Sequence, residues 1–322
     1  MKTPTKKVLS LLLAAATVVA CTLSLSSCGK KKGYTVGICQ LVRHEALDAA
    51  TQGFKDALTE ALGAENVTFI EQNAQNDTNA CSTIVTDFVS KKVDLIMANA
   101  TPALQAAFNA TTTSPVLGTS ITEYGVALDI PDFNGTVGGN VSGTSDLAPL
   151  TEQADMILEL FPDAKNVGLI YCSAEPNSEY QVKVIEEYLT DKGLTCTRFS
   201  FSDSNDISAV TTAAAAQSDV IYIPTDNTAA SCSETIGNIV REKKVPVVAG
   251  EQGICAGCGV ATLSISYYDL GVKTGEMAAK ILKGEEKISE MPIEYATATK
   301  MYNPAICEEL GITVPEGYTA IE

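Results

Sequence analysis

A chain of 322 residues that is 45 % hydrophobic and 19 % charged has the length of two globular domains, and this composition excludes an intrinsically disordered chain. Its formal net charge of −17 argues against nucleic acid as a partner, because nucleic-acid binding depends on neutralising phosphate charge. His44 is the only histidine, which excludes mechanisms that need two histidines, including most catalytic zinc sites.

Residues 1–27 have the pattern of an export signal peptide. Three lysines near the start precede an apolar run that ends at Leu25, and two serines then lead directly to Cys28. A basic start, a short apolar stretch and small residues before a cleavage site are typical of secretory signals. The segment resembles a bacterial lipobox, which would place a lipid on Cys28 and make residues 28–33 a tether; Cys21 is a rival position, and an uncleaved membrane helix is the alternative. We therefore predict a lipid-anchored protein on the outer side of a cell membrane.

Predicted strands and helices alternate through the first half of the mature chain. Apolar residues at helical spacing predict a helix over 44–62. A second helix is predicted over 77–91 with Asp77 or Thr78 as its cap, and Pro102 suits the first turn of a third. The predicted strands are short and apolar, at 34–40, 67–70, 93–98 and 115–118. Such alternation is typical of a parallel sheet covered on both faces.

The same order of elements starts again in the second half. Three short strand motifs recur at offsets of 131, 125 and 131 residues: 36–38 and 167–170, 94–96 and 219–221, and 115–117 and 246–248. We predict an α/β protein made of two similar lobes, each a doubly wound parallel sheet. Two unrelated α/β domains are the alternative.

The segments that follow the predicted strands are rich in serine, threonine, asparagine and acidic residues. In open parallel sheets, ligands bind outside the carboxyl ends of the strands. If the two lobes face each other, these segments line one cleft, which predicts a polar site for a small molecule. The segments are 40–45, 99–101 and 119–123 in the first half, and 173–179, 225–228 and 251–253 in the second.

The sequence holds no constellation typical of catalysis. It lacks a Gly-x-Ser-x-Gly elbow, a Walker loop and a Gly-x-Gly-x-x-Gly turn after a strand. A nucleophilic pair of His44 with Cys39 is disfavoured because Cys39 lies in an apolar run. Cys255 and Cys258 form a lone Cys-x-x-Cys, which is weak evidence for zinc binding or redox chemistry. We predict a protein that is not an enzyme and that carries no metal or cofactor.

Several motifs, taken in order, resemble a known family. They are the lipobox at Cys28, Val36–Asp48, Gln72–Asp77, Ala100–Ala103, Gly139–Asp146, Pro224–Thr228 and Ser266–Gly271. This order resembles the ABC transporter substrate-binding lipoproteins, whose better-known members take up tryptophan and tyrosine. The resemblance implies a type I periplasmic-binding fold, in which two Rossmann-like lobes close on a ligand about a hinge. It also implies a monomer that binds an amino acid and has an ABC permease and ATPase as partners; a sugar- or nucleoside-binding receptor of the same fold, or a ligand sensor, is the alternative.

The resemblance further implies how the chain divides between the lobes. The first lobe would comprise residues 34–145 and about 267–290, and the second residues 146–266 and the tail 291–322. The chain would then cross between the lobes three times at the hinge.

An amino acid carries a carboxylate and an ammonium, and the polar loops offer a partner for each. The carboxylate suits the helix N-terminus at Thr101, where free N–H groups favour an anion, with hydroxyls from Ser120 and Thr122. The ammonium needs an acceptor such as Asp226 or Glu251 in the second lobe. Helix capping is the alternative role for Thr101 and Asp226. The other candidate ligand contacts are His44, Asn177, Ser178, Thr225, Asn227 and Thr228, and the candidates for aromatic stacking are Tyr124, Tyr267 and Tyr268.

Overall fold

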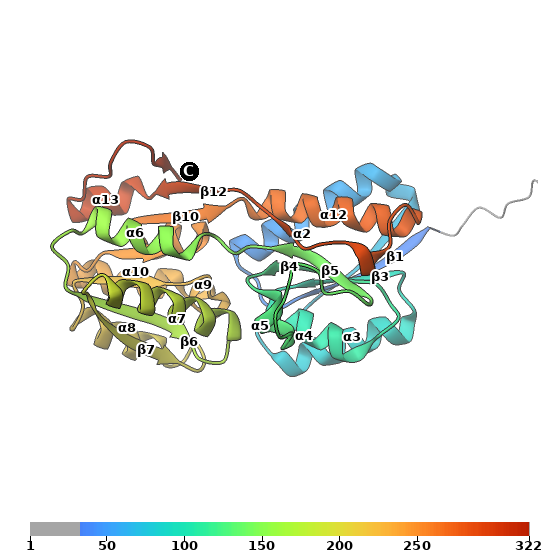
Figure 1. Ribbon diagram of the computed structural model, residues 1–322, viewed down its shortest axis with the longest axis horizontal. Helices are drawn as coiled ribbons and strands as arrows, with labels where there is room; N and C mark the ends of the chain where they lie inside the picture. Colours follow the sequence, from blue (N-terminus) through green and yellow to red (C-terminus); the bar gives the residue numbers. More distant parts are fainter. Residues whose placement is uncertain (1–32, 322) are drawn as a thin grey trace, which may run out of the picture. The chain divides into compact units, whose positions relative to one another are not determined.

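The computed structural model describes residues 33–321 (Figure 1). The predicted signal peptide, Cys28 and all but the last residue of the predicted tether lie outside the described residues. Within residues 33–321, no helix combines the length and the apolar character that crossing a membrane requires.

A six-stranded sheet in the order β11-β5-β4-β3-β1-β2 forms the first lobe, and all its strand pairs are parallel. Apolar clusters cover both faces, with Phe54 and Leu58 on one side and Phe88 and Leu104 on the other. The strands are β1 (Tyr34–Gln40), β2 (Val67–Asn73), β3 (Leu95–Asn99), β4 (Val116–Ile121), β5 (Val141–Ser145) and β11 (Glu294–Tyr295). The helices are α2 (Glu45–Leu62), η2 (Ala64–Asn66), α3 (Thr78–Lys91), α4 (Thr101–Ala110), α5 (Tyr124–Leu128), α12 (Tyr267–Lys283) and η3 (Ile288–Glu290).

A seven-stranded sheet in the order β13-β12-β10-β9-β8-β6-β7 forms the second lobe. Its strands run parallel except that β12 pairs antiparallel with β10. The strands are β6 (Asn166–Cys172), β7 (Thr195–Phe201), β8 (Val220–Ile223), β9 (Val247–Ala249), β10 (Ala261–Ile265), β12 (Ala298–Tyr302) and β13 (Thr319–Ala320). The helices are α6 (Leu150–Leu160), α7 (Pro176–Asp191), α8 (Ile207–Ala215), α9 (Asn227–Ser231), α10 (Ser233–Lys243), α11 (Gln252–Cys258) and α13 (Pro304–Leu310).

The two sheets repeat one topology, so the predicted pair of doubly wound lobes is confirmed. The order β2-β1-β3-β4-β5 in the first lobe matches β7-β6-β8-β9-β10 in the second. In this order the strand sequence reverses between β1 and β3, and between β6 and β8, and such switch points are where open sheets bind ligands. Local predictions also hold: Asp77 caps α3 by accepting from the backbone N–H groups of Asn79 and Ala80, and Pro102 lies in the first turn of α4.

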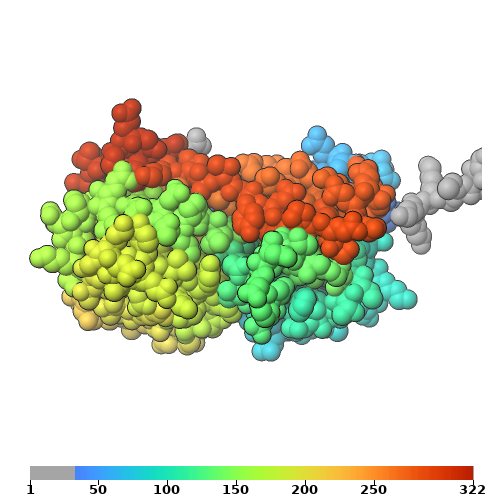
Figure 2. Space-filling model, viewed as in Figure 1, coloured from blue at the N-terminus to red at the C-terminus, as the bar shows by residue number. Residues whose placement is uncertain are grey.

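The third crossing between the lobes comes later than residue 291. Strand β11 pairs with β5 in the first lobe, and Met291 and Ile293 are buried in that lobe's apolar clusters. The chain first adds β11 to the edge of the first sheet, beside β5. The tail therefore enters the second lobe only after Tyr295. In Figure 2 this orange-to-red end of the chain passes from one lobe to the other on the face shown.

Two glycines allow α12 to pack closely along α2. A Cβ atom at Gly53 would collide with the carbonyl oxygen of Tyr268, and one at Gly271 would collide with that of Ala50. Helix α12 follows the second crossing of the chain between the lobes, and this close contact packs it against the first lobe.

All eight cysteines of the described chain are free thiols. Cys39 and Cys81 belong to a core of the first lobe, whereas Cys255 and Cys258 are buried on α11 in the second. Burial raises the pKa of the Cys255 thiol, which disfavours the reactive thiolate. The buried cysteines of these cores thus pack as small hydrophobic residues.

Candidate functional site

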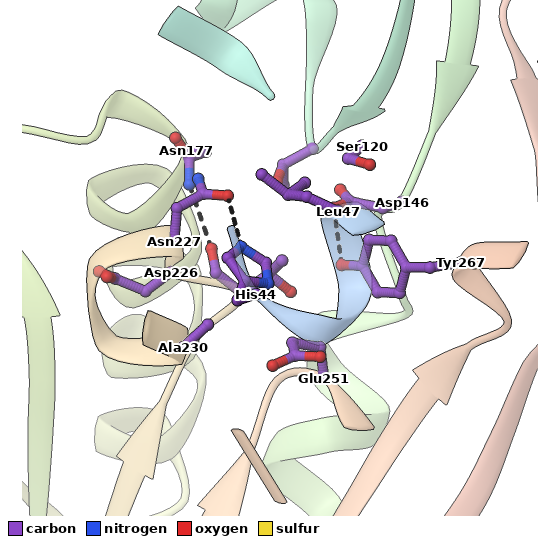
Figure 3. Close-up of a pocket in the computed structure, with 12 residues that line it drawn as sticks. His44, Leu47, Ser120, Asp146, Asn177, Asp226, Asn227, Ala230, Glu251 and Tyr267 are labelled. Carbon is purple, nitrogen blue, oxygen red and sulfur yellow. Dashed lines mark hydrogen bonds between the residues drawn. The ribbon is translucent and has the colours of Figure 1, made fainter. Parts of the chain in front are cut away.

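A small cavity lies at the carboxyl ends of the strands of both sheets (Figure 3). His44 follows β1, Ser120 and Thr122 lie at the end of β4, and Asn177 and Asn227 follow β6 and β8. Its volume is about 10 Å³, which is the room that one buried water molecule needs. The residues that line it are His44, Leu47, Ser120, Thr122, Asp146, Asn177, Thr225, Asp226, Asn227, Ala230, Glu251 and Tyr267.

The structure brings most of the predicted contact residues to this cavity. Thr101, Ser178 and Thr228 do not line it, although all three are buried. Ser178 lies behind Asn177, and the amide nitrogen of Asn177 is 3.3 Å from the hydroxyl of Ser178. The predicted residues that do line the cavity are His44, Ser120, Thr122, Asn177, Thr225, Asp226, Asn227 and Glu251.

Sequence reasoning missed Leu47, Asp146 and Ala230, and it considered Tyr267 only for stacking. Asp146 directly follows β5, and Tyr267 starts the helix after β10. Both positions follow a strand, as the other loop candidates do, so the rule that found those candidates would have found them as well. Asp146 and Tyr267 follow the fifth strand of each lobe, where the chain crosses the hinge, whereas the predicted segments follow earlier strands.

Buried polar atoms without a hydrogen-bond partner gather at the cavity. Of seven such side-chain atoms in the described residues, four belong to its lining: His44 Nδ1, Ser120 Oγ, Asp146 Oδ1 and Asn177 Oδ1. Buried polar groups in proteins are nearly always paired, because leaving one unpaired costs about 1–3 kcal/mol. This concentration makes the cavity the candidate site for a polar ligand.

Of the two carboxylate oxygens of Asp146, one accepts a hydrogen bond and the other has no partner. The hydroxyl of Tyr267 donates to Oδ2 at 2.8 Å, whereas Oδ1 has no partner. The residue is only 3 % exposed, and burial raises the pKa of its carboxyl to about 6. At neutral pH, Asp146 thus presents a buried negative charge that lacks a cationic partner.

The other two acidic residues of the lining are helix caps. Asp226 accepts from the backbone N–H of Ala229 at 2.8 Å and from that of Cys172 at 2.6 Å, so both oxygens are occupied. Glu251 likewise accepts from the N–H groups of two residues in α11. Burial and the neighbouring Glu175 carboxylate raise the pKa of Asp226, and burial raises the pKa of Glu251 to about 7. The structure thus supports the capping alternative for Asp226, because the chain turns straight from β8 into α9 and folds the side chain back onto the helix.

Thr101 does not face the cavity. It is the first residue of α4 and is 2 % exposed, but the cavity lies nearer to the end of β4. Ser120 lines the cavity there: it is 6 % exposed, has a φ of 55° and carries a hydroxyl without a hydrogen-bond partner. Of the three residues predicted to bind a carboxylate, only Ser120 and Thr122 therefore line the cavity.

His44 bridges the two lobes as a neutral imidazole. Its Nε2 lies 3.3 Å from Oδ1 of Asn227, and the amide of Asn227 donates to Glu175, so this oxygen is the acceptor. Nε2 therefore carries the hydrogen and Nδ1 is a bare acceptor. Burial lowers the pKa of His44, which favours the uncharged ring at neutral pH.

A second hydrogen bond also joins the lobes. The amide of Asn76, in the turn between β2 and α3, donates to the hydroxyl of Thr228 at 3.0 Å. With the His44–Asn227 contact, it closes the cleft around a cavity of only about 10 Å³. An amino acid would need the lobes to separate before it could enter.

Two lobes of this topology with a polar cavity between their switch points define a type I periplasmic-binding protein, and solved structures of that fold superpose on the chain. Residues 35–320 match the family model of the ABC transporter substrate binding proteins, and the chain belongs to this family. Proteins of this family are extracytoplasmic binding proteins of transporters.

A curated relative and two solved structures are particularly similar. A tyrosine-binding protein of Clostridioides difficile is 34 % identical over 273 residues, covering 84 % of this chain and 79 % of the relative. An ABC domain from Streptococcus pneumoniae in complex with L-Trp superposes with a TM-score of 0.85 at 32 % identity, over 90 % of this chain and 100 % of that one. A ligand-free, open substrate binding protein from Clostridium difficile superposes with a TM-score of only 0.68 at 37 % identity. The match covers 90 % of this chain and 99 % of that one. The chain therefore superposes better on the L-Trp complex than on the ligand-free, open structure, although its identity to the complex is lower.

Proposed function

We propose that this protein captures an aromatic amino acid, with tryptophan and tyrosine as the first candidates, and delivers it to an ABC permease and its ATPase. The observation that carries the proposal is the set of four unpartnered polar atoms around one interlobe cavity. The tyrosine-binding relative and the L-Trp complex support the choice of ligand. The protein acts as a monomer and releases its ligand chemically unchanged.

The proposed pose places the charged ends of the ligand on residues with free atoms. The ammonium donates to Oδ1 of Asp146, and Oδ1 of Asn177 offers a second acceptor from the other lobe. The carboxylate accepts from the hydroxyl of Ser120, with Thr122 beside it. Because the ligand then joins both lobes, its binding shifts the equilibrium between open and closed arrangements toward the closed one.

Isothermal titration calorimetry tests this function. We expect one saturable site per chain for tryptophan, tyrosine or phenylalanine, and no response to glycine, which has the same charged ends but no ring. Saturable binding of nucleosides or sugars, together with silence for all three aromatic amino acids, would contradict the proposal. Such a result would favour a sugar- or nucleoside-binding receptor of the same fold.

We further propose that Cys28 carries the lipid that anchors the protein to the outer face of the membrane. The support is the sequence pattern of residues 1–28 together with membership of an extracytoplasmic family. Two acyl chains hold a protein stably at a membrane, whereas one is marginal.

Replacing Cys28 by alanine is expected to abolish anchoring, because no thiol remains at that position to be acylated. Fractionation should find the variant in the medium or as an uncleaved precursor, while the control Cys21→Ala stays in the membrane fraction. A mature N-terminus that mass spectrometry finds unmodified, or modified at Cys21, would refute the assignment.

A further inference from the structure

Glu175 lies in the second lobe beside the cavity and accepts five hydrogen bonds. Its Oε2 receives the backbone N–H of Asn227 at 3.0 Å, the Asn227 amide at 2.7 Å and the Asn177 amide at 3.2 Å. Its Oε1 receives the backbone N–H of Thr228 at 2.9 Å and its hydroxyl at 2.8 Å. The side chain is 4 % exposed, and the cavity does not include it.

The two residues that Glu175 holds are the two that reach across to the first lobe. Asn227 meets His44, and Thr228 meets Asn76. Since the Asn227 amide and the Thr228 hydroxyl both donate to Glu175, their oxygen atoms are left to accept from the first lobe. One carboxylate therefore sets the direction of both hydrogen bonds. We call the His44–Asn227 and Asn76–Thr228 contacts the interlobe latch.

We propose that Glu175 is a positioning residue that holds the second-lobe half of the interlobe latch and so determines how firmly the lobes close on the ligand. The inference rests on the proposed function, because closure matters only if a ligand is captured. Hydrogen bonds to a carboxylate are the stronger kind, and they keep both side chains oriented while the cleft is open. The latch is thus preorganised in the second lobe and is completed only when the first lobe arrives.

A double-mutant cycle in ligand affinity tests the proposal. Asn76→Ala removes one latch bond and is expected to weaken binding of tryptophan or tyrosine about two- to tenfold. Glu175→Gln has one acceptor oxygen and an amide that faces other donors, so it is expected to weaken binding at least as much. In the Glu175→Gln background, Asn76→Ala should add little. An equal effect of Asn76→Ala in both backgrounds would overturn the proposal.

A matched control separates positioning from general stability. Asp219 is another second-lobe carboxylate that accepts backbone N–H groups, those of Lys165 and Asn166, and it does not line the cavity. Asp219→Asn is expected to lower the melting temperature while the affinity stays within about twofold of wild type. If Asp219→Asn and Glu175→Gln reduce affinity equally, Glu175 has only a structural role.

Small-angle X-ray scattering of the ligand-free proteins makes the test independent of the ligand's identity. Glu175→Gln is expected to have a larger radius of gyration than wild type, because the open arrangement gains population. Equal radii would overturn the latch even if aromatic amino acids bind, and calorimetric silence would overturn the proposed function alone. If Glu175→Gln does not fold, Thr228→Ala takes its place. This variant should weaken binding as much as Asn76→Ala does. Additive effects of Thr228→Ala and Asn76→Ala in the double variant would refute the latch.

Discussion

Replacing Asp146 by asparagine is expected to weaken the binding of tryptophan and tyrosine by about ten- to a hundredfold. Asparagine keeps the shape and an oxygen acceptor but removes the charge that faces the ligand's ammonium. A hydrogen bond to a charged group contributes about 1.5–3 kcal/mol, and about 1.4 kcal/mol corresponds to a factor of ten in affinity. Titration calorimetry of the variant against wild type measures the loss.

The same substitution is expected to preserve or raise the melting temperature of the ligand-free protein. Burial raises the pKa of Asp146 to about 6, so its ionised form is costly in the folded state at neutral pH. The amide removes that cost, and an affinity loss with unimpaired stability is the signature of a ligand contact.

Asp226→Asn is the matched control, because Asp226 also lines the cavity but its oxygens are bound by backbone N–H groups. It is expected to reduce stability and to leave affinity within about twofold. The opposite pattern, in which Asp226→Asn loses affinity and Asp146→Asn retains it, would show that Asp226 binds the ammonium.

Affinity for the amino acid is expected to fall by about tenfold for each pH unit below 6. Only the ionised carboxylate of Asp146 pairs with an ammonium, so the bound ligand lowers the pKa of this group below its ligand-free value of about 6. As the pH falls through 6, the free protein takes up a proton that binding must expel, and affinity declines until the complex is protonated too. Above pH 6 the contribution of Asp146 is constant.

Calorimetry between pH 4.5 and pH 8 distinguishes this group from its neighbours. Burial raises the pKa of Glu251 to about 7, raises that of Asp226 and lowers that of His44. Because these three side chains line the same cavity, the Asp146→Asn variant, rather than the pH alone, separates Asp146 from them. In Asp146→Asn the decline below pH 6 should disappear. A decline that persists unchanged in this variant would show that another group binds the proton.

The architecture and the position of the candidate site follow from the pattern of the sequence. Alternating apolar strands and helices predict parallel sheets, and the recurrence of three strand motifs predicts that the second lobe repeats the first. Residues directly after parallel strands must emerge at the carboxyl edge of a sheet, which is why His44, Asn177 and Asn227 could be placed at the cavity from their positions alone.

Which hydrogen bonds each of these side chains makes depends on the tertiary structure. Asp226 and Asp146 both follow a strand, but the first folds back onto N–H groups of α9 and β6, whereas the second keeps an oxygen free. Which oxygens are occupied depends on how the chain turns after the strand and on groups far away in sequence, such as the hydroxyl of Tyr267, 121 residues from Asp146. For the same reason Glu175, which reads as an ordinary residue before a helix, orients two residues that lie more than 50 positions further along the chain.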